Sequence, residues 1–148
     1  MSRTDCQAPE GAILIVTGSD LRAEQMDRPL AYYLQQCITK ELGPIGHPIF
    51  VVSDCRYLYQ SGFDECATIS VGGPGVNAVA HSWLRTVPFV FAADDEFYVQ
   101  MNDAIEEPAR ASIWGVDHET TKLAIATFVE RFLDEFLLNC HARVHGST

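Results

Sequence analysis

The sequence predicts an α/β fold with a mostly parallel sheet, and three observations support this class. Short apolar runs such as residues 12–16 end in glycine, hydroxyl or carboxylate residues, as buried parallel strands do. Segments with helical periodicity separate the early runs, which calls for crossover connections. Two later apolar runs, 87–91 and 97–101, are too close for a crossover and therefore predict a β-hairpin.

The first half of the chain reads as two strands joined by a helix. The first strand is the β-branched run 12–16, and the second is 47–52. Between them, residues 27–42 place apolar side chains on one helical stripe. We expect Asp27 to be the N-cap of this helix and Pro29 to lie in its first turn.

The second half begins with a third strand, 68–71, which ends in a glycine-rich turn. A helix follows Asn77, then come the hairpin and a last strand at 111–116. We expect one long helix from Asp117, its N-cap, to about Asn139. With strand order 2-1-3 for the first three strands and the hairpin at or beyond an edge, this architecture is a three-layer Rossmann- or flavodoxin-like sandwich.

The length of 148 residues fits one domain spanning residues 1–148, since domains average roughly 150 residues. Hydrophobic residues make up 47% of the chain and charged residues 20%, as in globular proteins rather than disordered ones. We expect a flexible N-terminus at residues 1–11 and a frayed tail at residues 141–148.

The formal net charge of −10 argues against nucleic acid or an anionic membrane surface as a partner, because such a chain is repelled by phosphate groups. The five cysteines have no CxxC spacing, and the polar N-terminus lacks a signal-peptide pattern. These features predict a cytoplasmic protein with reduced thiols.

Four predicted strand ends carry glycine, hydroxyl, carboxylate or amide groups. In open parallel sheets, ligands bind at the carboxyl ends of the strands. This convergence predicts a site for a small ligand, an anion or a phosphate, without assigned catalysis or an identified cofactor. The ligand-binding candidates are Gly18, Ser19, Asp20, Ser53, Gly72, Gly73, Gly75, Asn77, Asp117 and His118. A purely architectural interpretation is also open, because such turns need helix caps and positive φ angles.

The glycine turn has a formal match to a dinucleotide fingerprint, Gly73-x-Gly75-x-x-Ala78, which leaves nucleotide-cofactor binding at 73–78 as an alternative. Pro74 counts against it, because proline removes an amide that a pyrophosphate would need. The turn also follows the third strand rather than the first.

The hexapeptide Gly72-Gly-Pro-Gly-Val-Asn77 resembles the GGPxxN turn of S-layer-type α/β domains in archaeal surface proteins, a group distantly similar to cell-wall-binding repeats. A second segment, 115–124, is similar to the glycine-to-helix segment of that family. The resemblance implies a Rossmann-like domain used for surface assembly or binding without catalysis. It therefore adds a structural or assembly domain to the alternatives.

The enzyme alternative is a hydrolase or transferase with Cys55, Asp54 or His118 as catalytic candidates. Cys55 follows a strand end beside a cationic residue, where a thiolate is favoured. Alternatively, Asp20, Asp54, Asp117 and His118 could surround a divalent ion. We assign no metal site, since aspartates at strand ends also serve as helix caps.

A homodimer is the expected partner state. The hairpin at 87–101 has apolar strands that need cover, and Phe128, Phe132 and Phe136 would add a dimer surface if they were exposed. Their simpler interpretation is a core face.

Overall fold

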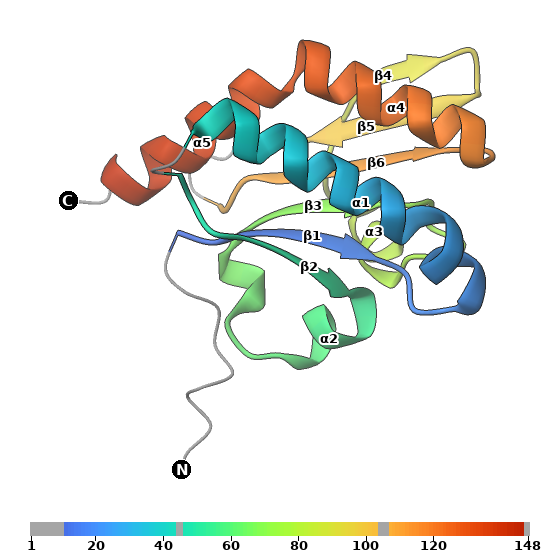
Figure 1. Ribbon diagram of the computed structural model, residues 1–148, viewed down its shortest axis with the longest axis horizontal. Coiled ribbons are helices and arrows are strands. Elements are labelled where there is room, and N and C mark those ends of the chain that lie inside the picture. The colour runs from blue at the N-terminus through green and yellow to red at the C-terminus, as the bar shows by residue number, and fades with distance from the viewer. Residues whose placement is uncertain (1–10, 44–45, 104–106, 147–148) are drawn as a thin grey trace.

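The computed structural model describes residues 11–43, 46–103 and 107–146 (Figure 1). These residues form an α/β structure around one six-stranded sheet with the order β2-β1-β3-β6-β5-β4. The strands are β1 (Ile13–Thr17), β2 (Ile49–Ser53), β3 (Ala67–Val71), β4 (Phe89–Ala93), β5 (Phe97–Met101) and β6 (Arg110–Gly115). The expected flexible N-terminus lies, except for Gly11, outside the described residues.

The parallel part of the sheet consists of β2, β1, β3 and β6. The hairpin strands β4 and β5 complete the sheet in antiparallel pairing, with β5 against β6 and β4 at the edge. This arrangement confirms the predicted order 2-1-3 and the hairpin at an edge. All four parallel strands end on the same side, to which their arrowheads point in Figure 1.

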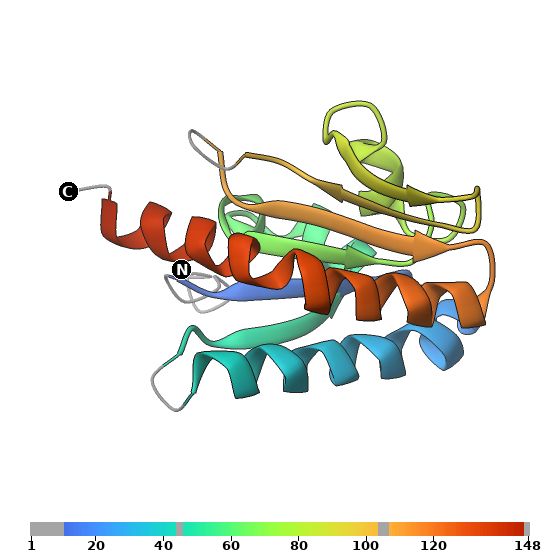
Figure 2. The same ribbon diagram turned by 90° about the horizontal axis from the view of Figure 1, so that it is seen from above.

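Helices lie on both faces of the sheet. They are α1 (Leu21–Leu42), α2 (Asp54–Tyr59), α3 (Ala78–Trp83), α4 (His118–Arg131) and α5 (Leu133–Gly146), with a short 3₁₀ helix, η2, at Phe63–Glu65. Helices α4 and α5 follow one another along one face of the sheet, with α1 beside them (Figure 2). Helices α2 and α3 and the 3₁₀ turn cover the other face beside β1. In the described part of the chain, no helix is both long and apolar enough to cross a bilayer.

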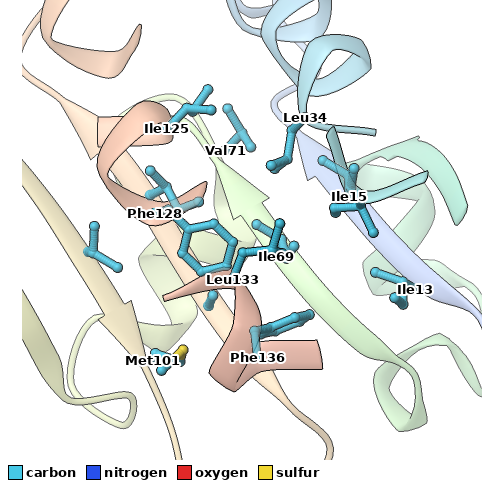
Figure 3. Close-up of a cluster of buried hydrophobic side chains, with 14 of the residues drawn as sticks. Ile13, Ile15, Leu34, Ile69, Val71, Met101, Ile125, Phe128, Leu133 and Phe136 are labelled. Carbon is cyan, nitrogen blue, oxygen red and sulfur yellow. The ribbon is translucent and has the colours of Figure 1, made fainter. Parts of the chain in front are cut away.

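The larger core lies between the sheet and the layer of α1, α4 and α5 (Figure 3). Alternate residues of β1 divide between the two faces, so that Ile13 and Ile15 join this core while Leu14 contributes to the smaller one. Phe128 and Phe136 are completely buried here. Each such side chain stabilises the fold by roughly 1.5–3 kcal/mol relative to an exposed one.

The start of α1 differs from the sequence prediction. The helix begins at Leu21, and its N-cap is Asp20, whose side chain accepts a hydrogen bond from Ala23 N at 2.8 Å. Asp27, the predicted cap, is instead buried within the helix, and Pro29 also lies inside it. The Asp-x-Pro pattern imitates a helix start, but Asp20 satisfies the free amides first.

The C-terminal helix also differs from the prediction, because it is two helices. Phe132 leaves the helical conformation with φ −127° and separates α4 from α5. The ring of Phe132 packs against Phe91 of β4 at 6.5 Å between centroids, while Leu133 enters the core. No glycine or proline marks this break, so only packing reveals it. Helix α5 continues through Gly146, past the expected tail boundary at 141.

Candidate functional site

A cavity of about 170 Å³ opens where the parallel strands end, between the start of α1, the glycine turn and the start of α4. Five of the ten predicted binding residues line it: Gly72, Gly73, Gly75, Asp117 and His118. The side chains that the prediction missed come mainly from α1: Arg22, Ala23, Met26 and Asp27, with Val76, Val116 and Thr121 from the loops and α4.

Asp27 is the most unusual group in this cavity. Its side chain is 9% exposed and makes no hydrogen bond or ion pair with any described residue. Burial raises the pKa of the Asp27 carboxyl above its ordinary value of 3.8. His118 and Arg22 act in the opposite direction, and Asp20 adds to the increase. A buried carboxylate without a partner is costly, and such groups are found where a ligand completes them.

Gly72 brings the backbone directly over this carboxylate. Its φ of +112° is a conformation that other residues rarely adopt. A Cβ atom built on Gly72 would lie 2.8 Å from Asp27 Oδ2. The first glycine of the turn is therefore needed both for the bend and for the close approach of β3 to α1.

His118 enters the cavity as the first residue of α4. Its Nδ1 atom is buried and has no hydrogen-bond partner among the described residues. The preceding Asp117 caps the helix, as predicted, by accepting hydrogen bonds from Thr120 N at 2.9 Å and Thr120 Oγ1 at 2.8 Å. These bonds lower the pKa of Asp117. Since the Asp117 side chain is occupied by capping, His118 is the group of this pair that is free for a ligand.

The glycine turn uses most of its own amides internally. Gly73 O accepts hydrogen bonds from Val76 N at 3.1 Å and Asn77 N at 2.9 Å, and Gly72 N donates to Ile113 O. Within the described chain, the amides of Gly73 and Gly75 have no protein acceptor. Of the amides in the glycine turn, those of Gly73 and Gly75 are therefore the two that remain as donors.

The helix start after the glycine turn also lacks the free amides that a bound dinucleotide would need. A pyrophosphate needs free amides at the helix start after the turn. Here Ala78 N donates to Asp54 Oδ2 at 2.7 Å, while Val79 N and Ala80 N donate to Asn77. The pattern 73–78 is a tight turn whose helix start is already capped.

The Asn77 side chain links two strands at the carboxyl edge of the sheet. Its Nδ2 donates to Val16 O and Val71 O, each at 3.0 Å, and thereby joins β1 to β3. Its Oδ1 accepts from two amides of α3. All hydrogen-bonding positions of this buried amide are filled, so the side chain holds the site together and does not face a ligand.

Ser19, Ser53 and Asp54 gather on the α2–α3 side of the edge, outside the cavity. Asp54 is buried and accepts a hydrogen bond from Ser19 Oγ as well as from Ala78 N. Ser53, and not Asp54, caps α2. Gly18 lies between the two sides, where a Cβ atom would overlap the carbonyl oxygen of Val76. The strand ends therefore do not form the single site that the sequence predicts. One part lines the cavity, and another part is linked by the hydrogen bonds of Asp54 with Ser19 Oγ and Ala78 N.

The catalytic and metal alternatives find little support in this arrangement. Cys55 is exposed on α2 and does not line the cavity with His118. Asp20 caps α1, and Asp54 accepts a hydrogen bond from Ser19. Among the described residues, no three His, Cys, Asp or Glu side chains form a group that could hold a metal ion.

Asp27 could have been found from the sequence by extending the helix. With Asp20 as the cap, the buried stripe Ala31, Leu34 and Ile38 continues back to position 27 at the spacing i, i+4, i+7, i+11. A carboxylate on the apolar face of a helix is a recognisable signal. The prediction of Asp27 as the helix cap is the reason that its place on the apolar face is missed.

Comparison with known proteins does not identify the chain. No protein-family model matches the sequence. A search of curated proteins finds no significant match either. The function must therefore be inferred from the cavity itself.

Proposed function

We propose that this protein binds a small ligand with an anionic group in the cavity between α1, the glycine turn and α4. The observation that carries the proposal is a set of polar groups that lack internal partners and line one cavity. They belong to the side chains of Arg22, Asp27 and His118 and to the backbone amides of Gly73 and Gly75. Polar groups left unsatisfied in a concave site are typical of ligand binding.

The donors favour an anionic group on the ligand. Arg22 is always charged and makes no ion pair with any described residue. Together with the Gly73 and Gly75 amides it supplies donors for a carboxylate or phosphate. At about 170 Å³, the cavity is below the usual range for drug-sized ligands and close to cavities of roughly 150 Å³ that hold benzene. The ligand is therefore a small metabolite rather than a nucleotide.

The fold classification and the cellular location predicted from the sequence belong to the same proposal. The helices on both faces and the order β2-β1-β3 support a three-layer Rossmann- or flavodoxin-like classification. The cysteines at 37, 55, 66 and 140 are free, which supports a reducing, cytoplasmic location. An assembly role like that of S-layer modules stays a competing hypothesis, as does an enzyme based on Cys55 or an aspartate-held metal.

The test compares two arginines of α1. Isothermal titration with butyrate and with inorganic phosphate should show binding of at least one of them to the wild type. Arg22→Ala should weaken that binding by about tenfold or more, the equivalent of about 1.4 kcal/mol. Arg28→Ala is the matched control, because Arg28 lies in the same helix and pairs with Glu24 outside the cavity.

A steric variant provides an independent check. A Cβ atom on Gly75 meets no atom within 4 Å, so Gly75→Val should fold normally and project into the cavity mouth. Loss of binding with an unchanged melting temperature would support the site. Equal binding of both probes by the wild type, Arg22→Ala and Gly75→Val would refute it.

A further inference from the structure

The cavity presents one unpaired negative charge and one unpaired positive charge from the same helix. Asp27 and Arg22 both line it, and neither makes an ion pair with a described residue. The other carboxylate in the lining, Asp117, keeps its negative charge, but its Oδ1 atom already accepts hydrogen bonds from Thr120. The cavity is therefore electrically bipolar rather than simply cationic.

Helix geometry explains why the two charges do not satisfy each other. Residues five apart on an α-helix are separated by roughly 140° around the axis and about 7.5 Å along it. Ion pairs on helices instead join residues three or four apart. Helix α1 contains such a pair in the same segment, Arg28 with Glu24 at 3.9 Å. Arg22 and Asp27 lack this spacing and form no direct ion pair, although the charge of Arg22 lowers the pKa of Asp27.

We propose that the ligand is a small zwitterion with one ammonium and one carboxylate group, as in an α-amino acid. The ammonium would lie against Asp27, and the carboxylate would lie toward Arg22 and the amides of Gly73 and Gly75. This inference rests on the proposed function and adds the cationic end of the ligand and the residue that selects it.

Charge balance favours a zwitterion over a simple anion. A lone carboxylate would satisfy Arg22 but would leave the Asp27 carboxylate buried, unpaired and repelled by the ligand. A lone amine would pair with Asp27 but would make no use of Arg22, whose exposed side chain lies at the cavity. Burial raises the pKa of Asp27, and a neighbouring ammonium would lower it again. Of the other titratable groups that act on this carboxyl, His118 lowers its pKa as Arg22 does, and Asp20 raises it.

Three related probes test the inference: 2-aminobutyrate, butyrate, which lacks its ammonium group, and propylamine, which lacks its carboxylate group. Titration calorimetry on the full chain at neutral pH should show 2-aminobutyrate binding at least about tenfold more tightly than either of the others. Asp27→Asn should reduce the preference for 2-aminobutyrate over butyrate to less than about threefold. Asp64→Asn, which removes an exposed carboxylate outside the cavity, should keep the full preference.

The outcomes separate this inference from the proposed function. If butyrate or propylamine binds as tightly as 2-aminobutyrate, or if Asp27→Asn keeps the wild-type preference, the zwitterion is wrong. Butyrate binding that still depends on Arg22 would then leave the proposed function standing. If none of the three probes and no phosphate binds, both proposals fail. Asp27→Ser, checked by circular dichroism, replaces Asp27→Asn if the latter does not fold.

Discussion

Asp27 occupies a position where an apolar side chain would stabilise α1. Its neighbours on the buried stripe, Ala31, Leu34 and Ile38, have no exposed surface. A carboxylate at this place loses hydration and gains no hydrogen bond from the described chain. Residues that break the local pattern at a cost in stability are characteristic of functional sites, and Asp27 combines this property with access to a cavity.

The raised pKa of Asp27 makes a prediction about stability. Well below the ordinary value of 3.8 the carboxyl is protonated in both the folded and the unfolded state, so its ionisation does not affect stability. As pH rises through the higher pKa of the folded state, only the unfolded chain ionises freely, so the wild type loses stability. Asp27→Asn should therefore be at least as stable as the wild type at pH 7, and its advantage should disappear near pH 3.5–4.

Urea unfolding of both proteins between pH 3.5 and pH 7 checks this prediction. The difference between the two curves isolates Asp27 from the other carboxylates. The groups facing it, Asp20 and Arg22 from α1 and His118 from α4, are common to both proteins. A pH-independent difference, or an Asp27→Asn protein that becomes less stable as pH rises, would contradict the raised pKa.

At the scale of elements, the carboxyl edge depends on one side chain. Asn77 links β1, β3 and the start of α3 through four hydrogen bonds, whereas Ser53 makes a single capping bond to Arg56 N. Because the cavity lies beside this joint, the position of the glycine turn relative to α1 depends on it.

Asn77→Ala should destabilise the protein by about 2–4 kcal/mol, since it removes a cap together with the two hydrogen bonds that Asn77 donates to buried strand carbonyls. Ser53→Ala, the matched control, should cost only about 1 kcal/mol because it removes a cap alone. Chemical denaturation with fluorescence detection of Trp83 and Trp114 measures both changes. Equal losses for the two variants would show that the bonds of Asn77 to the strands contribute little.

At the scale of the whole molecule, one part of the sheet is incompletely covered. Phe89 of β4 is 50% exposed, and its ring lies 5.9 Å from Tyr98 and 5.9 Å from Trp114. Val90 beside it is also exposed. An aromatic cluster of this kind at a sheet edge is the surface that the expected homodimer would use.

Light scattering after size exclusion should give twice the chain mass for the wild type. Phe89→Asp should give a monomer, because it places a charge in the contact. Phe50→Asp at the opposite edge strand, β2, should leave the dimer intact. A wild type that is monomeric at every concentration would remove the dimer, and a monomer from Phe50→Asp alone would move the contact to β2.

The sequence by itself determined the α/β fold class, the strand order 2-1-3 and the hairpin. These features follow from local rules, because apolar runs, turn residues and loop lengths act over a few positions. Helix caps were harder, since Asp20 and Asp27 both resemble a helix start and only Asp20 accepts the amide bond. The break at Phe132 carried no local signal because its contact is with a distant strand.

Only the tertiary structure decided which polar residues remain free for a ligand. Asn77, Ser19 and Asp54 are chemically as suitable as Asp27, but hydrogen bonds between distant segments occupy them. Asp27 and Arg22 are left unpaired because helix geometry separates them and the glycine turn packs over one of them. Composition specifies the groups that are present, and long-range contacts determine which of them still lack a partner.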